Sequence, residues 1–419
     1  MTGPEREAVA LLTGPGMGPV LERVLRPAGL DTGRWTLRRV HHRPGAGVSA
    51  VFDVAALHGQ LRRPEAVCVS TAHPPADGTE DTARDGAGDA DDAARSRVRL
   101  EHEGLVLTAW RHPHDPWLPG LARASSPGVV GRDVFSAAAP AALTEISYRP
   151  TRRAVLRAAH GPEVRYLKVL RRGRAAALQS RLRMLLDAGL PAPVPAAEPE
   201  QDVVVLHQLP GAPMAAAVRD DGAAALQPDH VLALLDALPA AALDLPHRPS
   251  WTDRVLHYGH AAAVALPEEQ GRIERLTRTV ELARHGTDPG PVVPVHGDLY
   301  EANLLVAPDT AGRFGPVSGL LDVDAVGPGH RVDDLACLVA HLAVLPTVSD
   351  RYTHAPAATE RFLAGFDTVV DPAALRVRCA GVALSLVAGA RRSGGPPDRA
   401  RRRLAIAERF LAIAQERAS

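Results

Sequence analysis

The chain has 419 residues, in which 48 lysines and arginines balance 48 aspartates and glutamates. This balance argues against a nucleic-acid or membrane-surface partner, and 46% hydrophobic residues are enough to bury a core. The three cysteines have no metal-like spacing, and no apolar run approaches the ~20 residues that span a bilayer. Without a basic, apolar leader, we expect a cytoplasmic protein of roughly two to three domains.

Residues 1–130 predict an N-terminal α/β extension or cap. A short helix at 20–25 precedes strand-like runs at 35–42, 50–54, 66–70 and 105–110. Residues 74–97 are acidic, rich in Gly and Ala and free of aromatic residues, a composition typical of a disordered loop. His42-Arg-Pro resembles Tyr148-Arg-Pro, so two interpretations stay open: a degenerate copy of the following segment, or an unrelated cap.

Residues 131–210 predict a small antiparallel β lobe. Three β-like runs at 143–148, 154–158 and 164–170 are joined by short connections, which favours an antiparallel meander. A helical stretch at 174–188 ends before a glycine and a proline, and a further strand is expected at 202–207.

Residues 211–419 predict a larger helical lobe. Helical patterns cover 228–243, 251–264, 267–284, 334–345, 357–367, 372–391 and 397–416. The β-like runs 292–295 and 303–306 suggest an embedded hairpin, with a further run at 319–323. The predicted fold class is therefore α+β, with a small β lobe, a larger helical lobe and the N-terminal extension.

The polar loop His296-Gly-Asp298-Leu-Tyr-Glu-Ala-Asn303 lies between two apolar runs. Phosphoryl transfer needs a carboxylate that orients the attacking hydroxyl and accepts its proton, and an oxygen ligand that holds Mg²⁺ against the nucleotide phosphates. Asp298 suits the first task and Asn303 the second. The alternative is a polar hairpin turn in which both side chains satisfy backbone groups.

A second group of carboxylates follows the apolar run that ends at residue 321. Asp322 comes directly after this run, and carboxylate oxygens are the hard ligands that Mg²⁺ prefers. Asp324 lies on the same face if the strand continues, and would be a second ligand or a support. Asp333 or Asp334 instead suits the N-cap of a helix that begins near Leu335.

Lys168 is the only lysine of the chain, and Asn303 is the only asparagine. A lysine in an apolar strand must reach a partner or water, because burying an unpaired ammonium group is costly, and nucleotide phosphates are such a partner. Arginine is used everywhere else, so we interpret the single compact ammonium group as phosphate-binding. The alternative is a lysine on the solvent face of an edge strand.

These motifs together resemble the aminoglycoside phosphotransferase family, a kinase-like group that also includes choline and homoserine kinases. The likeness covers the chain from about residue 143 to 390 and rests on His296-Gly-Asp298, Asn303-Leu-Leu, Asp322-Val-Asp324 and Lys168. It implies transfer of the γ-phosphoryl group of ATP or GTP to a hydroxyl group of a small molecule.

The resemblance also implies roles for individual residues. Asp298 would be the catalytic base, Asn303 and Asp322 the Mg²⁺ ligands, and Lys168 the residue that binds the nucleotide phosphates. The backbone at His207 and Leu209 would receive the adenine, and His296 and Asp324 would support the site.

The sequence departs from the family pattern in two places. The helix at 174–188 has no glutamate to pair with Lys168 and offers only Gln179, and the loop Arg149-Pro-Thr-Arg-Arg153 has no glycine. A second hypothesis therefore stays open: a catalytically silent pseudokinase that acts as a nucleotide- or metabolite-binding regulatory module. The last helices carry more Arg than acid, which argues against a polycationic acceptor, and no pattern indicates the oligomeric state.

Overall fold

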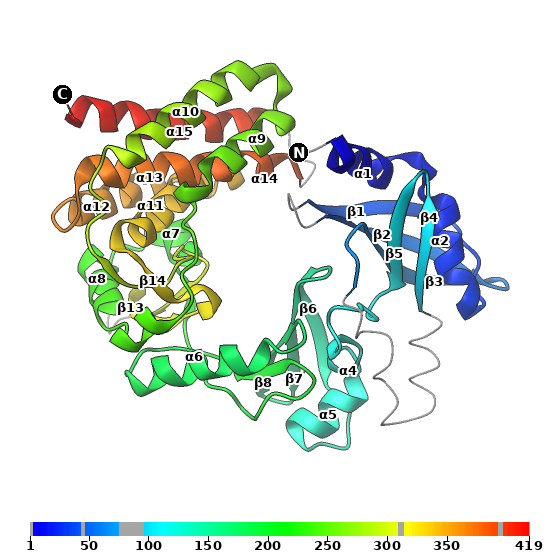
Figure 1. Ribbon diagram of the computed structural model, residues 1–419. Helices are drawn as coiled ribbons and strands as arrows, with labels where there is room; N and C mark the ends of the chain where they lie inside the picture. The colour runs from blue at the N-terminus through cyan, green and yellow to red at the C-terminus, as the bar shows by residue number, and fades with distance from the viewer. Residues whose placement is uncertain (1–2, 43–46, 75–95, 309–313, 393–396, 419) are drawn as a thin grey trace. The chain divides into compact units, whose positions relative to one another are not determined.

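The computed structural model describes residues 3–42, 47–74, 96–308, 314–392 and 397–418. The chain divides into two compact units, one with residues 1–179 and 195–208 and the other with residues 180–194 and 209–419 (Figure 1). The first unit holds both the extension and the β lobe, so the boundary expected at 130 stays a prediction. Of the expected disordered loop, residues 75–95 lie outside the described residues.

The first unit begins with an antiparallel sheet that is covered by helices on one face. Helices α1 (Gly3–Thr13) and α2 (Gly18–Leu25) pack against this sheet, whose strand order is β1-β2-β3-β5-β4. Its strands are β1 (Trp35–His42), β2 (Val48–His58), β3 (Leu61–Ser70), β4 (Arg97–His102) and β5 (Leu105–Arg111). The apolar periodicity predicts four of these strands, whereas it does not predict β4 or α1.

The second sheet of this unit is the expected meander. Short helices α4 (Leu121–Ala124) and α5 (Pro127–Phe135) lead into four strands in the order β6-β7-β8-β9. These strands are β6 (Ala142–Arg149), β7 (Arg153–His160), β8 (Glu163–Leu170) and β9 (Val203–His207), and helix α6 (Ala175–Asp187) stands between the last two. The short connections thus give the antiparallel pairing that they predict.

The extension and the meander share one apolar core. Trp110 of β5 is fully buried and belongs to the same cluster as Leu156 and Leu167 of the meander. Its indole N–H donates to the hydroxyl of Tyr148 (3.0 Å), which donates in turn to the buried carboxylate of Asp115 (2.9 Å). The extension is therefore packed into the β lobe rather than tethered beside it.

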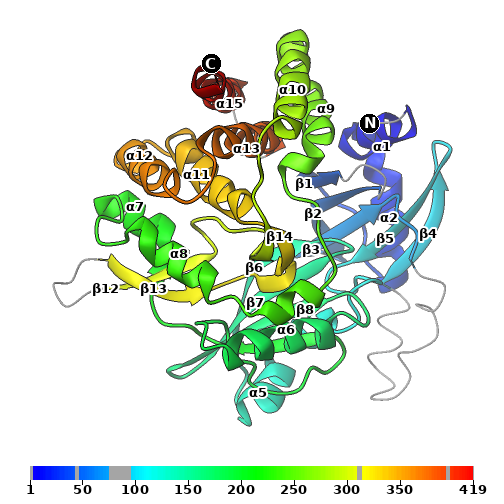
Figure 2. The ribbon, with the colours of Figure 1, turned by 60° about the vertical axis from the view of Figure 1, so that its left-hand side comes forward.

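The second unit is mostly helical, and α13 forms its centre. Its helices are α7 (Met214–Asp221), α8 (Pro228–Asp236), α9 (Val255–Ala265), α10 (Gln270–His285), α11 (Arg331–Val348), α12 (Ala355–Phe366), α13 (Pro372–Ser385), α14 (Val387–Arg392) and α15 (Pro397–Ala418). Helix α13 packs against α9, α11 and α15 (Figure 2).

One stretch of this unit corrects the expectation that no apolar run is long enough to span a membrane. Among the described residues, Pro372–Ala390 meets that test by length and composition alone. However, 78% of its most apolar window is buried inside the fold, and the fully buried side chains of α13 face neighbouring helices. The stretch is thus the core of the helical unit.

Two small sheets lie among these helices. Strands β10 (Ala212–Pro213), β12 (Leu304–Pro308) and β13 (Phe314–Leu320) form one sheet, whereas β11 (Val292–Val295) pairs with β14 (Gly327–His330). The expected hairpin of residues 292–295 and 303–306 is therefore wrong, because these runs belong to different sheets.

Candidate active site

The loop that follows β11 is held by a buried carboxylate of α11. One carboxylate oxygen of Asp334 accepts from the backbone N–H of His296 (2.6 Å), and the other accepts from that of Gly297 (2.8 Å). Burial raises the pKa of Asp334 to about 7, and the two N–H donors oppose the shift. Helix α11 begins at Arg331 with His330 as its N-cap, so the N-cap role expected of Asp333 or Asp334 is wrong.

His296 joins this loop to the segment that carries Asp322. Its fully buried ring donates from Nε2 to the carbonyl of Leu321 (2.9 Å), while Nδ1 accepts from the N–H of Asp298 (3.3 Å). This pair of contacts places the proton on Nε2. Gly297 has φ +78°, and a Cβ there would lie 2.7 Å from the carbonyl oxygen of Ala325, so the turn requires glycine.

Asn303 closes the other end of the loop. Its side-chain amide donates from Nδ2 to the backbone carbonyl of Asp298 (2.9 Å). Its backbone carbonyl accepts from the backbone N–H of Leu321 (2.8 Å). The backbone of Asp298 is thus fixed on both sides, by His296 at the N–H and by Asn303 at the carbonyl. The contact through Nδ2 leaves the amide oxygen of Asn303 as the atom suited to a cation.

Asp322 follows β13 in the left-handed backbone region, with φ 54° and ψ 48°. For a residue other than glycine this conformation costs about 1–3 kcal/mol, and such residues cluster at functional sites. The next residues, Val323–Ala325, form a 3-10 turn. The β run expected at 319–323 therefore ends early, since β13 ends at Leu320, and the condition for Asp324 to share a face with Asp322 is not met.

The donor set of these segments fits Mg²⁺. Asn303 and Asp322 offer hard oxygen atoms, and the bond from Leu321 to Asn303 ties the two segments together. Mg²⁺ is usually held by one or two carboxylates together with substrate phosphates, rather than by a complete protein cage. Asn303 is only 5% exposed, so its orientation is fixed by packing as well as by hydrogen bonding.

The sequence gives no sign of Trp251, which contacts the expected base. Its indole Nε1–H donates to Oδ1 of Asp298 at 3.2 Å. A cavity of about 570 Å³ lies beside this contact, lined by Trp251 and Gly297 among others. The remaining lining residues are His247, Arg248, Pro249, Ser250, Asp253, Arg254, Arg284, Val295, Gly329, His330, Asp333, Asp334 and Cys337. No sequence spacing connects residue 251 with residue 298, so only the fold could bring them together.

The remaining expected nucleotide residues lie on several segments. In the first unit, Lys168 lies on the inner strand β8 between Val155 and Val204 and is 7% exposed, which excludes the solvent-facing edge alternative. Gln179 is buried, and its amide donates to the carbonyl of Ala197 (3.4 Å). His207 ends β9 in this unit.

Leu209 belongs to the second unit, just before a constrained glycine. Gly211 has φ +103°, and a Cβ there would lie 2.8 Å from the carbonyl oxygen of Val306. The segment that includes Leu209 is thus fixed against β12.

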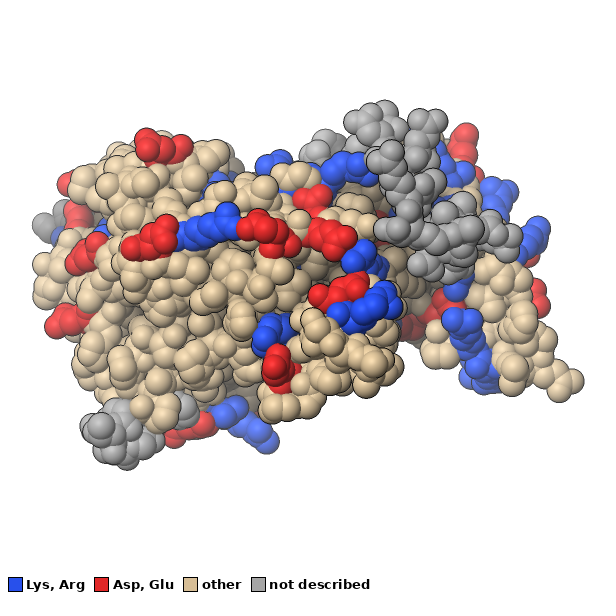
Figure 3. Space-filling model, turned by 90° about the horizontal axis from the view of Figure 1, so that it is seen from below, with Lys and Arg blue, Asp and Glu red and all other residues tan. Residues whose placement is uncertain are grey.

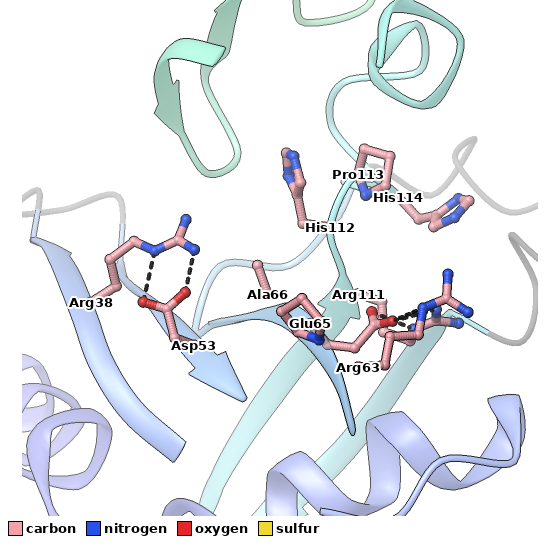
Figure 4. Close-up of a pocket in the computed structure, with 10 residues that line it drawn as sticks. Arg38, Asp53, Arg63, Glu65, Ala66, Arg111, His112, Pro113 and His114 are labelled. Carbon is pink, nitrogen blue, oxygen red and sulfur yellow. Dashed lines mark hydrogen bonds and ion pairs between the residues drawn. The ribbon is translucent and has the colours of Figure 1, made fainter. Parts of the chain in front are cut away.

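A second cavity, of about 410 Å³, lies in the extension and has charged walls (Figure 4). Asp53 pairs with Arg38, and the carboxylate of Glu65 pairs with both Arg111 (3.2 Å) and Arg63 (3.1 Å). Three arginines face two carboxylates in this lining, and both carboxylates are already paired with arginine, so the cavity has no charge suited to a cation and only one arginine in excess. We assign no ligand to this cavity.

The chain is a small-molecule phosphotransferase of the protein-kinase-like class, as its family match shows. Residues 145–366, more than half of the chain, match the Phosphotransferase enzyme family (APH), and the chain belongs to this family. No curated protein matches the chain.

Several solved structures are similar to the chain. An aminoglycoside-3'-phosphotransferase of type VIII is 23% identical, with 58% of this chain and 92% of that one covered and a TM-score of 0.40. A macrolide 2'-phosphotransferase from Brachybacterium faecium is 21% identical, with 64% and 91% covered and a TM-score of 0.37. A choline kinase from Cryptosporidium parvum is 12% identical, with 71% and 96% covered and a TM-score of 0.45.

Proposed function

We propose that the chain transfers the γ-phosphoryl group of ATP or GTP to a hydroxyl group of a small molecule. The observation that carries this proposal is the hydrogen-bonded group around residues 296–303. It fixes the backbone of Asp298 at both ends and ties Asn303 to the segment of Asp322. Family membership supports the reaction type, and the loop supplies the residue kinds that it needs.

In this proposal Asp298 orients the acceptor hydroxyl and takes its proton. Asn303 and Asp322 hold Mg²⁺, which would neutralise phosphate charge when the nucleotide is bound. Lys168 contacts the nucleotide phosphates, and the backbone near His207 and Leu209 receives the base. His296 supports the loop by holding the N–H of Asp298.

A nucleotide- or metabolite-binding pseudokinase is the second candidate, and Gln179 favours it. The helix after β8 has no glutamate that could pair with Lys168 and offers only Gln179, whose amide contacts Ala197. An amide brings no negative charge toward an ammonium group, so the positioning of Lys168 would be weaker than in an active kinase.

ADP release from Mg²⁺-ATP in the presence of hydroxyl compounds separates the two candidates. Asp298→Ala should lower the rate by roughly 10²–10⁴-fold, as expected for a residue that positions and accepts a proton. Asp229→Ala, which changes an exposed carboxylate of α8, is the matched control and should keep the normal rate. Nucleotide binding without ADP release from any acceptor would favour the pseudokinase.

The acceptor screen should include cationic, neutral and anionic hydroxyl compounds. Part of the arginine excess of the last helices is offset by acids, since Arg401 of α15 pairs with Glu268 (2.7 Å) and Glu269 (3.3 Å). On the face in Figure 3, acidic and basic side chains are interspersed. The charges on this face therefore give no reason to leave out one class of acceptor.

A further inference from the structure

The contact between Trp251 and Asp298 is specific in geometry and has no part in the roles given so far. An indole N–H is a donor only, so it can hold a carboxylate without competing for the proton that a base must accept. The bond to Oδ1 fixes the rotation of the Asp298 carboxylate, while His296 and Asn303 fix its backbone.

The segment that carries Trp251 is itself firmly anchored. Ser250 and Asp253 exchange hydrogen bonds, from the N–H of Ser250 to Oδ2 of Asp253 (2.8 Å) and from the N–H of Asp253 to Oγ of Ser250 (3.2 Å). Thr252, which is 2% exposed, donates to the carbonyl of Arg378 on α13 (3.2 Å). The chain on either side of the indole is thus held against the core of the unit.

Two neighbours hold the ring of Trp251. The ring of Tyr258 lies 5.5 Å away at an interplanar angle of 30°, and the guanidinium group of Arg254 lies 5.3 Å from the indole centre. Arg254 also donates to the carbonyl of Ser250 (3.2 Å). The indole therefore has few ways to rotate away from Asp298.

Trp251 also lines the cavity of about 570 Å³ together with Gly297, the residue before Asp298. The acidic residues of this cavity have partners: Asp253 pairs with Arg284 (3.3 Å), Asp333 with Arg378 (3.3 Å), and Asp334 accepts from the loop backbone. The bond between the indole and Asp298 thus lies at the edge of a space that a small molecule could enter.

We infer that Trp251 is a positioning residue that aims the carboxylate of Asp298 at the acceptor and forms one wall of the acceptor cavity. This inference rests on the proposed function, because the carboxylate has to be aimed only if it serves as the base. If this hydrogen bond to a charged group is lost, kcat should fall by roughly tenfold to a hundredfold.

The contact can be tested without knowing the acceptor, by NMR of protein labelled with ¹⁵N-tryptophan. The chain has four tryptophans, and Trp251→Phe should remove one indole N–H signal and thereby assign it. Asp298→Ala should then shift this signal in the full-length protein and leave the signals of Trp35, Trp110 and Trp117 in place. An unmoved Trp251 signal would overturn the inference.

The rate effect can be tested by ADP release from Mg²⁺-ATP with water as the acceptor. Trp251→Phe keeps an aromatic ring but lacks the N–H, and should lower kcat about tenfold to a hundredfold while KM for ATP stays constant. The acidic limb of the pH–rate profile of this variant should move to higher pH, because the charged carboxylate of Asp298 loses a hydrogen-bond donor. Trp35→Phe, in the extension, is the matched control and should keep the normal rate and pH profile.

The two proposals fail in different ways. An active Asp298→Ala variant would overturn the proposed function itself. An inactive Asp298→Ala together with a fully active Trp251→Phe would overturn only the role of Trp251.

Discussion

Lys168 is the residue at which composition and structure agree best. It is the only lysine in the sequence, and it is buried on an inner strand, where an apolar side chain would be expected. The sequence predicts its importance because arginine has replaced lysine everywhere else. The sequence also singles out Asn303, and the structure ties this residue to Asp298.

We expect Lys168→Arg to lose most of the phosphotransfer activity although it keeps the charge. The guanidinium group is planar and larger, and it would not replace a compact ammonium group in the proposed phosphate contact. ADP release from Mg²⁺-ATP measures the effect. Arg165→Lys on the same strand, where Arg165 pairs with the exposed Glu163, should leave the rate near normal. A Lys168→Arg variant with the normal rate would remove the argument from the single lysine.

Glu301 should make the stability of the protein depend on pH. Burial raises its pKa from 4.5 to about 7, and Oε2 has no hydrogen-bond partner among the described residues. The nearby ring of His341 brings no compensating charge, because burial lowers the pKa of that residue to about 3. As the pH rises from about 4.5 to 7, the unfolded chain loses its proton first, so the folded state loses stability relative to it.

Glu301→Gln has no proton to lose in this range. The difference in unfolding free energy between this variant and wild type should therefore grow in favour of the variant, by up to roughly 3 kcal/mol between the two ends of this pH interval. Urea unfolding at several pH values measures this difference. Glu360→Gln, at an exposed site on α12, should run parallel to wild type. If the unfolding free energy of Glu301→Gln changed with pH in the same way as that of wild type, Glu301 would not be the source of the pH dependence.

Among the elements, the loop between β11 and β12 depends on contacts that are distant in sequence. Local patterns predict that strands exist, but they do not say which strands pair. For this reason the expected hairpin is wrong: strand β11 pairs with β14. The role of Asp334 is missed for the same reason, since its partners are the N–H groups of His296 and Gly297. Strands of the meander are predicted well because their pairing is set by short connections.

We expect Asp334→Asn to loosen this loop. An amide has one acceptor oxygen where the carboxylate has two, so one of the two loop N–H groups would lose its partner in a buried place. The cost in unfolding free energy should be about 1–3 kcal/mol, with a fall in kcat, because Asp298 follows directly. Chemical unfolding and ADP release measure both effects. Asp350→Asn, at an exposed site after α11, is the matched control. Unchanged stability and rate would contradict the anchoring role of Asp334.

At the scale of the whole chain, the extension is bound to the β lobe by a common core. The sequence predicts four of its strands but not this packing, because Val51, Cys68 and Trp110 alternate with residues that face α1 and α2. An alternating strand shows that it has two faces without showing what covers each one. The balance of acidic and basic residues does not show which elements cover either face of the sheet.

Trp110→Ala should therefore destabilise the extension and the meander together. The change removes a fully buried ring and leaves the hydroxyl of Tyr148 without the indole donor, a loss of about 3–5 kcal/mol. Hydrogen exchange should show faster opening in both β2 and β7. Trp35→Ala, which acts on a partly buried ring beside Phe52, should have its main effect within the extension. Faster opening confined to the extension in Trp110→Ala would contradict the shared core.

The single interior lysine also makes the protein unusually simple to label. Apart from the amino terminus of the chain, an acylating reagent meets only one primary amine, and that amine is buried on β8. Mass spectrometry of the peptide that contains it would report acylation at one position, without interference from surface amines. If a triphosphate covers this amine, acylation should slow as the triphosphate concentration rises, and the midpoint would give an affinity before any acceptor is known.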